Sequence, residues 1–374
     1  PVTAVAILKL VESGKLSLIK IDPVRQMRLV VENLEHLVIE RQREITIRHL
    51  LQHRGGWDRN ASFDAMFRSV AFANELGLEP PAEPDAIIRV MLGKPLDFTP
   101  GERYAYSNYG YCLLGRVIEK LTGQAYVDFV RSAILEPVGI ESMTIGGTRL
   151  SDRLAKEVCY YDPARGESVF ADDLGATVCH PYGAWYLEAM DSHGGWIASA
   201  VDLARFACAL DETSPNRLLD DEMLAECYVR PEGLAGFDDE GNPLPRYYGL
   251  GWSIRTDEDG NRSATHDGSL PGTNTRLWRR GDGLNVAVLF NTRVSPYGSR
   301  VVPPLMERLT PAIEGIEQWP ESLVCPEVIN GASDLLHEIF GKEGDGYHAR
   351  SALGFAALPT GAAVEIEAIF EIVE

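Results

Sequence analysis

Two short groups of residues in this chain have side chains and spacing suited to acyl-transfer chemistry. The first is the run YAYSN at 104–108, directly before a segment that predicts a helix over 110–123. A tyrosine is a weak base at its ordinary pKa of about 10, but a neighbouring Lys ammonium favours the phenolate form. Tyr106 could then take a proton from a Ser hydroxyl, and Asn108 could donate to a substrate carbonyl. The plainer interpretation is an aromatic loop that caps the helix.

The second group is HDGSLPG at 266–272, which the pattern places between two strands. Gly268 has no side chain, so substrate could approach the backbone closely there. The N–H of Ser269 could face a developing oxyanion. His266 could supply a positive or hydrogen-bonding group at the edge of the site. The plainer interpretation is a Gly/Asp hairpin turn with a surface histidine.

The elements that would position these groups are readable from hydrophobic periodicity and turn residues. Residues 2–13 are apolar almost all round, as in a helix buried in a large domain, with Gly14 as its end. Thr46 is a candidate N-cap for a helix over 45–53, and residues 54–103 look irregular. The pattern also predicts a helix at 201–211, strands from 247 onward and a helix at 302–318. It therefore indicates a helical middle followed by an antiparallel sheet.

Five segments in order resemble the class C β-lactamase, penicillin-binding protein, DD-peptidase and esterase family of serine hydrolases. They are ITIRHLLQHRGG, PGERYAYSNYGYCLLGRVIEKLTG, GGWIASAVDLARF, YGLGW and HDGSLPG, and with them the resemblance spans 1–318. It implies an α/β (α+β) fold with an antiparallel sheet flanked by helices and an all-helical subdomain. It also implies acyl-enzyme hydrolysis of an ester, amide or lactam, with Tyr106, Asn108, His266 and Ser269 as catalytic residues and Gly268 contacting substrate. His-x-Gly in place of Lys-Thr-Gly favours esterase or peptidase over β-lactamase activity.

The third motif of that family, Ser-x-x-Lys, is expected at the start of the first buried helix. Family members commonly continue Pro-x-Thr-Ala-x-Ala, and this chain begins PVTAVA. By this alignment the Lys would directly precede Pro1 and the nucleophilic Ser would lie three residues earlier. The run SLIK at 17–20 fits the pattern but follows the helix, about 20 Å from its start at 1.5 Å per residue. We therefore reject Ser17 as the nucleophile.

The last 48 residues differ from the rest of the chain. After a predicted linker at 319–326, residues 327–374 resemble the C-terminal part of the Rid (YjgF) family, through HARSALGFAALPTGAAVEIEAI. A helix at 329–341 and strands at 349–358 and 362–372 are expected. The resemblance implies that Arg350 binds a substrate carboxylate and that Glu365 activates water for imine hydrolysis. A surface arginine and an edge glutamate are the plainer interpretation.

Composition narrows the possible partners. A net charge of −20 repels phosphate backbones and anionic lipid, so we expect a small-molecule or peptide substrate, no nucleic acid and no membrane span. No cofactor and no metal are expected, because the six cysteines include no C-x-x-C pair. Buried free thiols mildly favour the cytoplasm, although an upstream export signal would change the compartment.

Three functions remain open from the sequence: a serine hydrolase, an inactive binding or assembly module of the same fold, and an imine deaminase acting through the tail. In the family, the segment upstream of the first helix supplies a helix and strands of the central sheet. Without them the strands after 247 would keep an unpaired edge, so a homo-oligomer or the tail could cover that edge.

Overall fold

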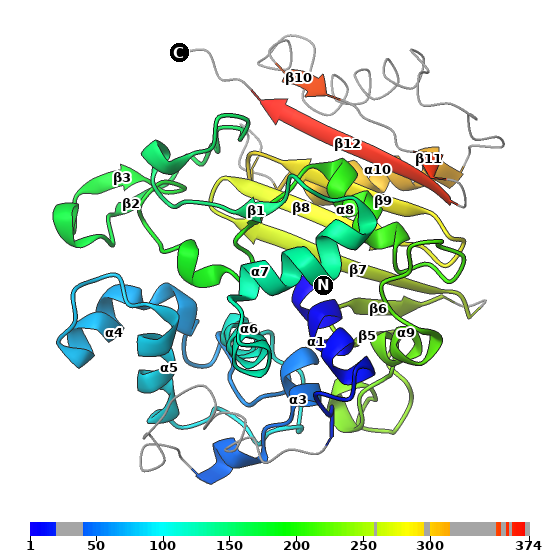
Figure 1. Ribbon diagram of the computed structural model, residues 1–374, viewed down its shortest axis with the longest axis horizontal. Coiled ribbons are helices and arrows are strands. Elements are labelled where there is room, and N and C mark those ends of the chain that lie inside the picture. Colours follow the sequence, from blue (N-terminus) through cyan, green and yellow to red (C-terminus); the bar gives the residue numbers. More distant parts are fainter. Residues whose placement is uncertain are drawn as a thin grey trace.

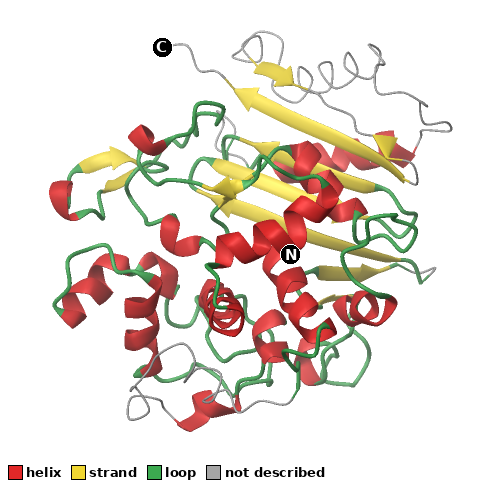
Figure 2. Ribbon diagram, viewed as in Figure 1, coloured by secondary structure: helices red, strands yellow, loops and turns green. Residues whose placement is uncertain are grey.

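The computed structural model describes residues 1–19, 40–257, 260–294, 300–314, 349–352, 357–358 and 361–370. Figures 1 and 2 show a sheet on one side and a group of short helices on the other, with long loops between them. The described helices are α1 (Val2–Glu12), α3 (Ile47–Leu51), α4 (Ser69–Leu76), α5 (Pro84–Leu92), α6 (Asn108–Thr122), α7 (Tyr126–Val130), α8 (Ala200–Cys208), α9 (Asp221–Cys227) and α10 (Val302–Glu314).

The main sheet contains the strands that were expected after residue 247. Its order is β10-β12-β9-β8-β7-β6-β5, with β11 pairing to β12. Helix α8 packs against β9 and β12, and α10 packs against β8. The strands are β5 (Arg246–Tyr248), β6 (Ser253–Thr256), β7 (Arg262–Leu270), β8 (Thr273–Arg279), β9 (Asn285–Phe290), β10 (Ala349–Ala352), β11 (Ala357–Leu358) and β12 (Gly361–Phe370). Two small pairs complete the strands: β1 (Thr144–Ile145) with β4 (Trp196–Ile197), and β2 (Arg165–Glu167) with β3 (Thr177–Cys179).

Strands β5 to β9 are antiparallel, as predicted, but β12 is not. It runs parallel to β9, from Ala363 opposite Asn285 to Ala368 opposite Phe290. The backbone of β12 thus continues the sheet beyond β9 (Figure 1). If the tail lay away from these strands, it could not cover the sheet edge. Because β12 pairs with β9, the idea that the tail covers this edge is not excluded. The linker at 319–326 and the helix at 329–341 lie outside the described residues.

Helix α1 is buried on nearly all sides, as its composition predicted. Residues 3–8 and Leu10 are all buried, and they contact α6 and α7. The helix ends at Glu12, and Gly14 follows with a φ of +70°. Ser17 lies beyond this end, which agrees with its rejection as the nucleophile, and Lys20 lies outside the described residues.

The helical subdomain contains more regular structure than the sequence predicted. The prediction that 54–103 is irregular was wrong, because α4 and α5 lie within it. Helix α5 starts with Pro84 in its first turn and buries Ile87, Ile88 and Met91 on one face. Pro at the start of a helix marks a helix beginning as well as a loop. The Pro and Gly residues within 54–103 therefore separate two short helices.

The predicted N-cap at Thr46 and the predicted end of a helix at 123 are confirmed. The side chain of Thr46 accepts from the backbone N–H of His49 at the start of α3. Ser107 caps α6 by accepting from the N–H of Gly110, and Gly123 ends α6 in the left-handed region. Because Ser107 is the cap, Tyr106 lies just outside the helix and Asn108 is its first residue.

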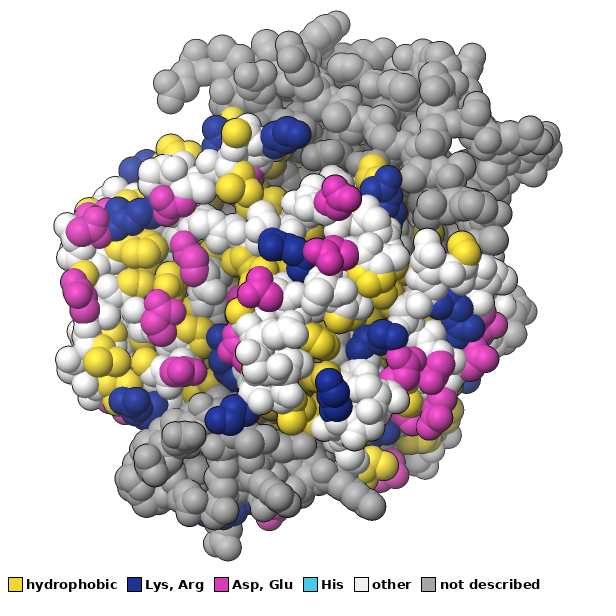
Figure 3. Space-filling view, viewed as in Figure 1, with side chains coloured by type: hydrophobic (Ala, Val, Ile, Leu, Met, Phe, Trp, Pro, Cys, Tyr) yellow, Lys and Arg dark blue, Asp and Glu magenta, His cyan; other side chains and the backbone are white. Residues whose placement is uncertain are grey.

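Two observations concern the described residues as a whole. Among them no helix is long and apolar enough to cross a membrane, and no disulfide joins the five described cysteines, of which Cys112, Cys208 and Cys227 are buried. On the face shown in Figure 3, acidic and basic side chains are interspersed with apolar ones.

Candidate active site

His53 is the centre of an aromatic cluster that joins the two sequence motifs. Its ring centroid lies 4.2 Å from Tyr106, 4.9 Å from Tyr111 and 4.6 Å from Tyr248. Tyr248 in turn lies 6.4 Å from His266. The tyrosine motif and the histidine motif, 160 positions apart in the chain (266 minus 106), therefore meet at one place.

His53 adopts an uncommon backbone conformation to reach this place. Its φ is +53°, a region that residues other than glycine rarely occupy. Its Nδ1 accepts from the backbone N–H of Ser107 at 3.2 Å. Burial lowers its pKa to about 3, the hydrogen bond from Ser107 opposes this shift, and the positive charge of Arg59 acts in the same direction as burial. His53 is thus a neutral side chain that fixes the loop carrying Tyr106.

Tyr106 is half-buried and faces one cation. The guanidinium carbon of Arg59 lies 4.8 Å from the centre of the Tyr106 ring. Burial raises the pKa of Tyr106 to about 12, Arg59 opposes this shift, and Tyr104 and Asp64 reinforce it. The described residues alone therefore keep the phenol protonated at neutral pH. A further cation next to the hydroxyl is needed before Tyr106 can act as a base.

Asn108 is buried and held by a carboxylate. Its Nδ2 donates to Oδ2 of Asp64 at 2.7 Å. Asp64 also caps the short 3-10 helix Ala65–Phe67 by accepting from the N–H of Met66. Burial raises the pKa of Asp64, while the bonds from Asn108 and Met66 lower it. This pair fixes the orientation of the Asn108 amide.

The start of α1 lies at the same cluster. A Cβ at Gly251 would come within 2.5 Å of Ala4 Cβ, 3.5 Å of the Tyr111 hydroxyl and 3.6 Å of Pro1 Cα. Gly251 also has a φ of +84°, so both the lack of space for a Cβ and the backbone conformation favour a glycine there. The first turn of α1 therefore opens onto the cluster.

The histidine motif occupies a different element from the one predicted. It was expected between two strands, but His266 to Leu270 lie inside β7, and the turn is only Pro271-Gly272. Pro followed by Gly at a φ of +78° is the sequence of a type II turn, which needs no further residues. Burial lowers the pKa of His266 well below its ordinary value, so a positive His266 is disfavoured and the hydrogen-bonding alternative stands.

Ser269 lies where β7 has a free edge. Strand β6 pairs with β7 only from Arg262 to Thr265. In a two-residue hairpin the pair next to the turn, here Leu270 and Thr273, exchanges hydrogen bonds, so the alternate residues Asp267 and Ser269 point their N–H groups away from β8. Past Thr265 no strand of the described residues receives them. The backbone N–H of exposed Ser269 is therefore available to a ligand.

Strand packing, as well as the predicted close approach of substrate, favours a glycine at position 268. It lies opposite Thr275 on β8, and a Cβ at Gly268 would clash with the Thr275 hydroxyl. The carbonyl of Gly268 also accepts from Nδ2 of Asn274 at 2.8 Å. The neighbouring strand thus already uses the space that a side chain would take on this face of β7.

The two residues predicted in the tail lie apart from this cluster. Arg350 on β10 pairs with Ile369, and Glu365 on β12 pairs with Ala287. Their register positions are separated by four residues of β12 (369 minus 365), about 13 Å at roughly 3.3 Å per residue. Strand β12 is the third strand counted from β7. The backbone does not bring these positions to the cluster formed by His53, Tyr106 and His266.

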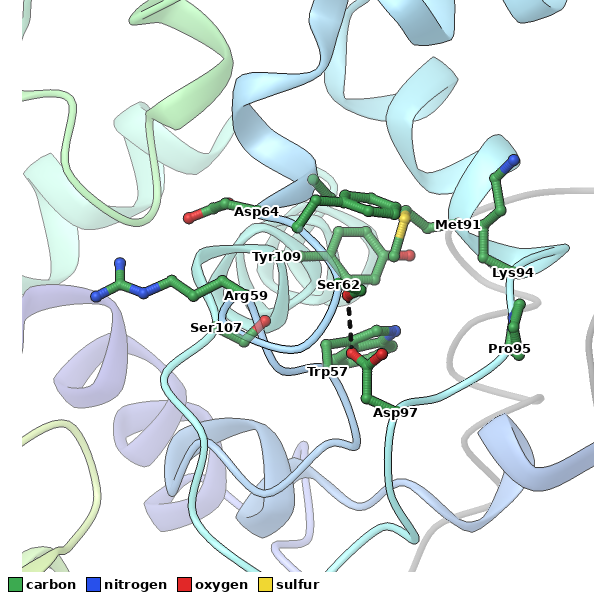
Figure 4. A pocket seen from close by; sticks show the side chains of 12 residues that line it. Trp57, Arg59, Ser62, Asp64, Met91, Lys94, Pro95, Asp97, Ser107 and Tyr109 are labelled. Carbon is green, nitrogen blue, oxygen red and sulfur yellow. Dashed lines mark hydrogen bonds between the residues drawn. The ribbon is translucent and has the colours of Figure 1, made fainter.

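A small pocket adjoins the tyrosine motif (Figure 4). Its volume is about 110 Å³. Ser107 and Asp64 form part of its wall, so it lies directly beside Tyr106 and Asn108. The other lining residues are Trp57, Arg59, Ser62, Phe63, Ala65, Met91, Lys94, Pro95, Asp97 and Tyr109.

Comparison with known proteins places the chain in a family. The family model described as Beta-lactamase matches residues 1–305. The chain belongs to the beta-lactamase family. It is 28% identical over 255 residues to penicillin-binding protein 4* of Bacillus subtilis, a match that covers 67% of this chain but only 51% of that protein. The chain thus spans about half the length of that relative.

Two amide-hydrolysing proteins are among the similar ones. A D-aminopeptidase of Brucella anthropi is 28% identical over 222 residues, which cover 59% of this chain and 37% of that protein. The structure of a D-stereospecific amidohydrolase from Streptomyces superposes with a TM-score of 0.53 at 26% identity, covering 75% of this chain and 76% of the other. The beta-lactamase-like fold predicted from the sequence is confirmed.

Sequence reasoning missed three residues of the site, namely His53, Asp64 and Arg59. His53 was within a quoted segment, but nothing in the sequence signals a left-handed histidine. Asp64 and Arg59 lie in the stretch that looked irregular. Among the described residues no group of three or more His, Cys, Asp or Glu side chains is arranged to hold a metal ion.

Proposed function

We propose that the protein is a serine acyl hydrolase that cleaves amide or peptide bonds through an acyl-enzyme. The observation that carries the proposal is the meeting of Tyr106, Asn108, His266 and the first turn of α1 around His53. Membership of the beta-lactamase family makes serine chemistry the expected use of such a cluster. The names of the D-aminopeptidase and D-stereospecific amidohydrolase relatives favour an amide of a D-amino acid as substrate.

The proposed nucleophile is the serine of a Ser-x-x-Lys segment that precedes residue 1 in a longer protein. Its hydroxyl oxygen attacks the substrate carbonyl carbon as its proton passes to the Tyr106 phenolate, which the Lys ammonium stabilises. The resulting oxyanion accepts from the N–H of Ser269 and from the N–H of the serine itself. Tyr106 then returns the proton to the leaving amine as the C–N bond breaks.

In this mechanism each remaining residue holds a group in place. Asn108, fixed by Asp64, donates to the substrate carbonyl or amide. His266, kept neutral by burial, offers a hydrogen bond at the edge of the site. Water finally attacks the acyl-enzyme carbonyl as its proton passes to the Tyr106 phenolate. Tyr106 then gives this proton to the serine oxygen as the C–O bond to the acyl group breaks.

Covalent labelling tests the proposal directly. We expect a fluorescent fluorophosphonate or penicillin to label the longer protein that carries the upstream segment, and not the chain of residues 1–374. Heat-denatured longer protein is the control for non-specific reaction. Absence of labelling in both, with each protein shown to be folded by circular dichroism, would contradict serine hydrolysis and leave a binding or assembly role.

A further inference from the structure

Arg59 is an exposed cation that lies over the ring of the proposed proton acceptor. Its guanidinium carbon is 4.8 Å from the centre of the Tyr106 ring. At such a distance the negative face of an aromatic ring attracts a guanidinium group. The attraction grows when the phenol loses its proton, because the ring and its oxygen then carry a full negative charge. Arg59 therefore interacts more strongly with the phenolate form of Tyr106 than with the phenol.

No carboxylate of the described residues forms an ion pair with Arg59. By contrast, nearby Arg103 is paired with Asp58 at 2.9 Å. Figure 4 shows the side chains of Arg59 and Asp64 pointing away from the pocket on the same side. The carboxylate of Asp64 already accepts from Nδ2 of Asn108 at 2.7 Å. The positive charge of Arg59 is therefore available to the ring that it covers.

The loop that carries Arg59 is fixed at the residue that precedes it. The backbone N–H of Asp58 donates to the carboxylate of Asp97 at 2.7 Å. The carboxylate of Asp58 binds Arg103 and accepts from the N–H of Asn60, the residue that follows Arg59, at 2.9 Å. With the backbone held on both sides, mainly side-chain rotamers remain to be ordered when Arg59 meets a negative charge.

Among the described residues, the other groups around Tyr106 supply no positive charge. Burial lowers the pKa of His53 to about 3 and that of His266 well below its ordinary value, so both rings are neutral at pH 7. Tyr104 and Asp64 raise the pKa of Tyr106, and Arg59 lowers it. The groups that surround this ring, from every element packed near it, are His53, Asp64, Tyr104, Tyr111, Tyr248 and His266.

We propose that Arg59 is a positioning residue that stabilises the phenolate form of Tyr106, the form that takes the proton of the serine. In the proposed mechanism the upstream Lys stabilises the same phenolate, and Arg59 adds a second positive charge over the face of the ring. The inference rests on the proposed hydrolase function for its part in catalysis. The interaction between Arg59 and Tyr106 can nevertheless be measured in the chain of residues 1–374 without turnover.

Titration of the phenol at position 106 tests the interaction. Difluorotyrosine in place of Tyr106 has a more acidic phenol, and fluorine NMR reports this one site. We expect Arg59→Gln to raise the pKa of this phenol by about 0.5 to 1, a modest change because the guanidinium is exposed and solvent screens its charge. Arg59→Lys retains the charge and should change this pKa by less than half as much.

Arg68→Gln is the matched control for this titration. Arg68 is also an exposed arginine over an aromatic ring, with its guanidinium carbon 5.3 Å from the centre of the Phe63 ring. That ring has no proton to lose, so Arg68→Gln should leave the pKa of the phenol at position 106 unchanged. Circular dichroism and the melting temperature show whether each variant is folded.

The pH profile of acylation tests the part that Arg59 takes in catalysis. In the longer protein Arg59→Gln should lower the labelling rate about three- to tenfold below the pKa of Tyr106, because a smaller fraction of the phenol is ionised there. At higher pH the rate should return to within about twofold of the wild type. Arg59→Lys should recover most of the loss. A purely structural role would lower the rate at every pH.

Three results would overturn the inference. They are a phenol pKa at position 106 that Arg59→Gln leaves unchanged, a rate loss that is equal at every pH, and a loss that Arg59→Lys does not recover. Failure of the hydrolase proposal has a different signature, namely no covalent labelling of the longer protein alongside a phenol pKa that still depends on the charge at position 59.

Discussion

The cluster around His53 is formed by two groups of residues, here called walls, which are held in position by different means. The helical wall, formed by His53, Asp64, Tyr106 and Asn108, consists of side chains that other side chains and backbone groups hold by hydrogen bonds and ring contacts. The strand wall, formed by His266 and residues 268–269 of β7, presents backbone groups whose positions follow from strand register.

This difference indicates how each wall should respond to substitution. On the helical wall the chemistry belongs to the side chain, so changing the side chain removes it. On the strand wall the group proposed to act is a backbone N–H, which most substitutions retain. The following experiments test whether the two walls differ in this way, starting with the largest expected effect.

Tyr106→Phe on the helical wall should reduce acylation of the longer protein about 10²- to 10⁴-fold, the usual contribution of a positioned proton acceptor. Rapid-quench measurement of the labelling rate checks this. Tyr186→Phe, which loses a hydroxyl bonded to Glu83, is the control and should label at the wild-type rate. A Tyr106→Phe rate within threefold of the wild type would remove Tyr106 from the mechanism.

On the strand wall, Ser269→Pro and Ser269→Ala form a matched pair. Proline removes the backbone N–H, so we expect a 10²- to 10³-fold loss of acylation rate, typical of one oxyanion donor. The N–H points away from β8, so proline breaks no ladder hydrogen bond. Alanine retains the N–H and should stay within about twofold of the wild type. Equal losses in both variants would assign the role to the Ser269 side chain instead.

Stability at low pH should depend on His53 of the helical wall. Its pKa is about 3 in the folded chain and 6.5 when unfolded, so the unfolded state binds the extra proton first as pH falls. The stabilising contribution is present above pH 6.5 and is lost as pH falls toward 3, at about 1.4 kcal/mol per pH unit. Asn tolerates a positive φ, so His53→Asn is the suitable variant.

Urea unfolding at pH 7, 6, 5 and 4 measures this dependence. We expect the slope of the free energy of unfolding against pH to fall by about 1.4 kcal/mol per unit in His53→Asn. His180→Asn, at a histidine outside the cluster around His53, is the control. An unchanged slope in His53→Asn would show that His53 is not held neutral in the fold.

The sequence predicted the residues of the strand wall but not the element that carries them. Motif order identified His266, Gly268 and Ser269, but it placed them in a turn, because Gly and Asp are typical turn residues. Inside β7 a glycine is favoured by the Thr275 hydroxyl on the neighbouring strand. That contact depends on which residues of β7 and β8 lie opposite each other, and a local sequence pattern does not determine this register.

The helical wall shows the opposite limitation. Tyr106 and Asn108 were singled out from the Tyr-x-Asn motif, and the structure places them on either side of Ser107, the cap of α6. His53 and Asp64 were missed, because they act through contacts with residues 53 and 44 positions away (106 minus 53, and 108 minus 64). Local periodicity predicts which segment forms a helix, whereas long-range hydrogen bonds appear only once the chain is folded.

The last experiment separates the two reasons for a glycine at 268. Gly268→Ala should destabilise the chain by about 1–3 kcal/mol, because its Cβ clashes with the Thr275 hydroxyl. Adding Thr275→Ala removes the clash and should restore the melting temperature, with Thr275→Ala alone as the control. The labelling rate of the double variant then decides the role. Recovery of the rate means that Gly268 is needed for strand packing only, whereas a rate that stays low in a stable protein means that substrate approaches the backbone there.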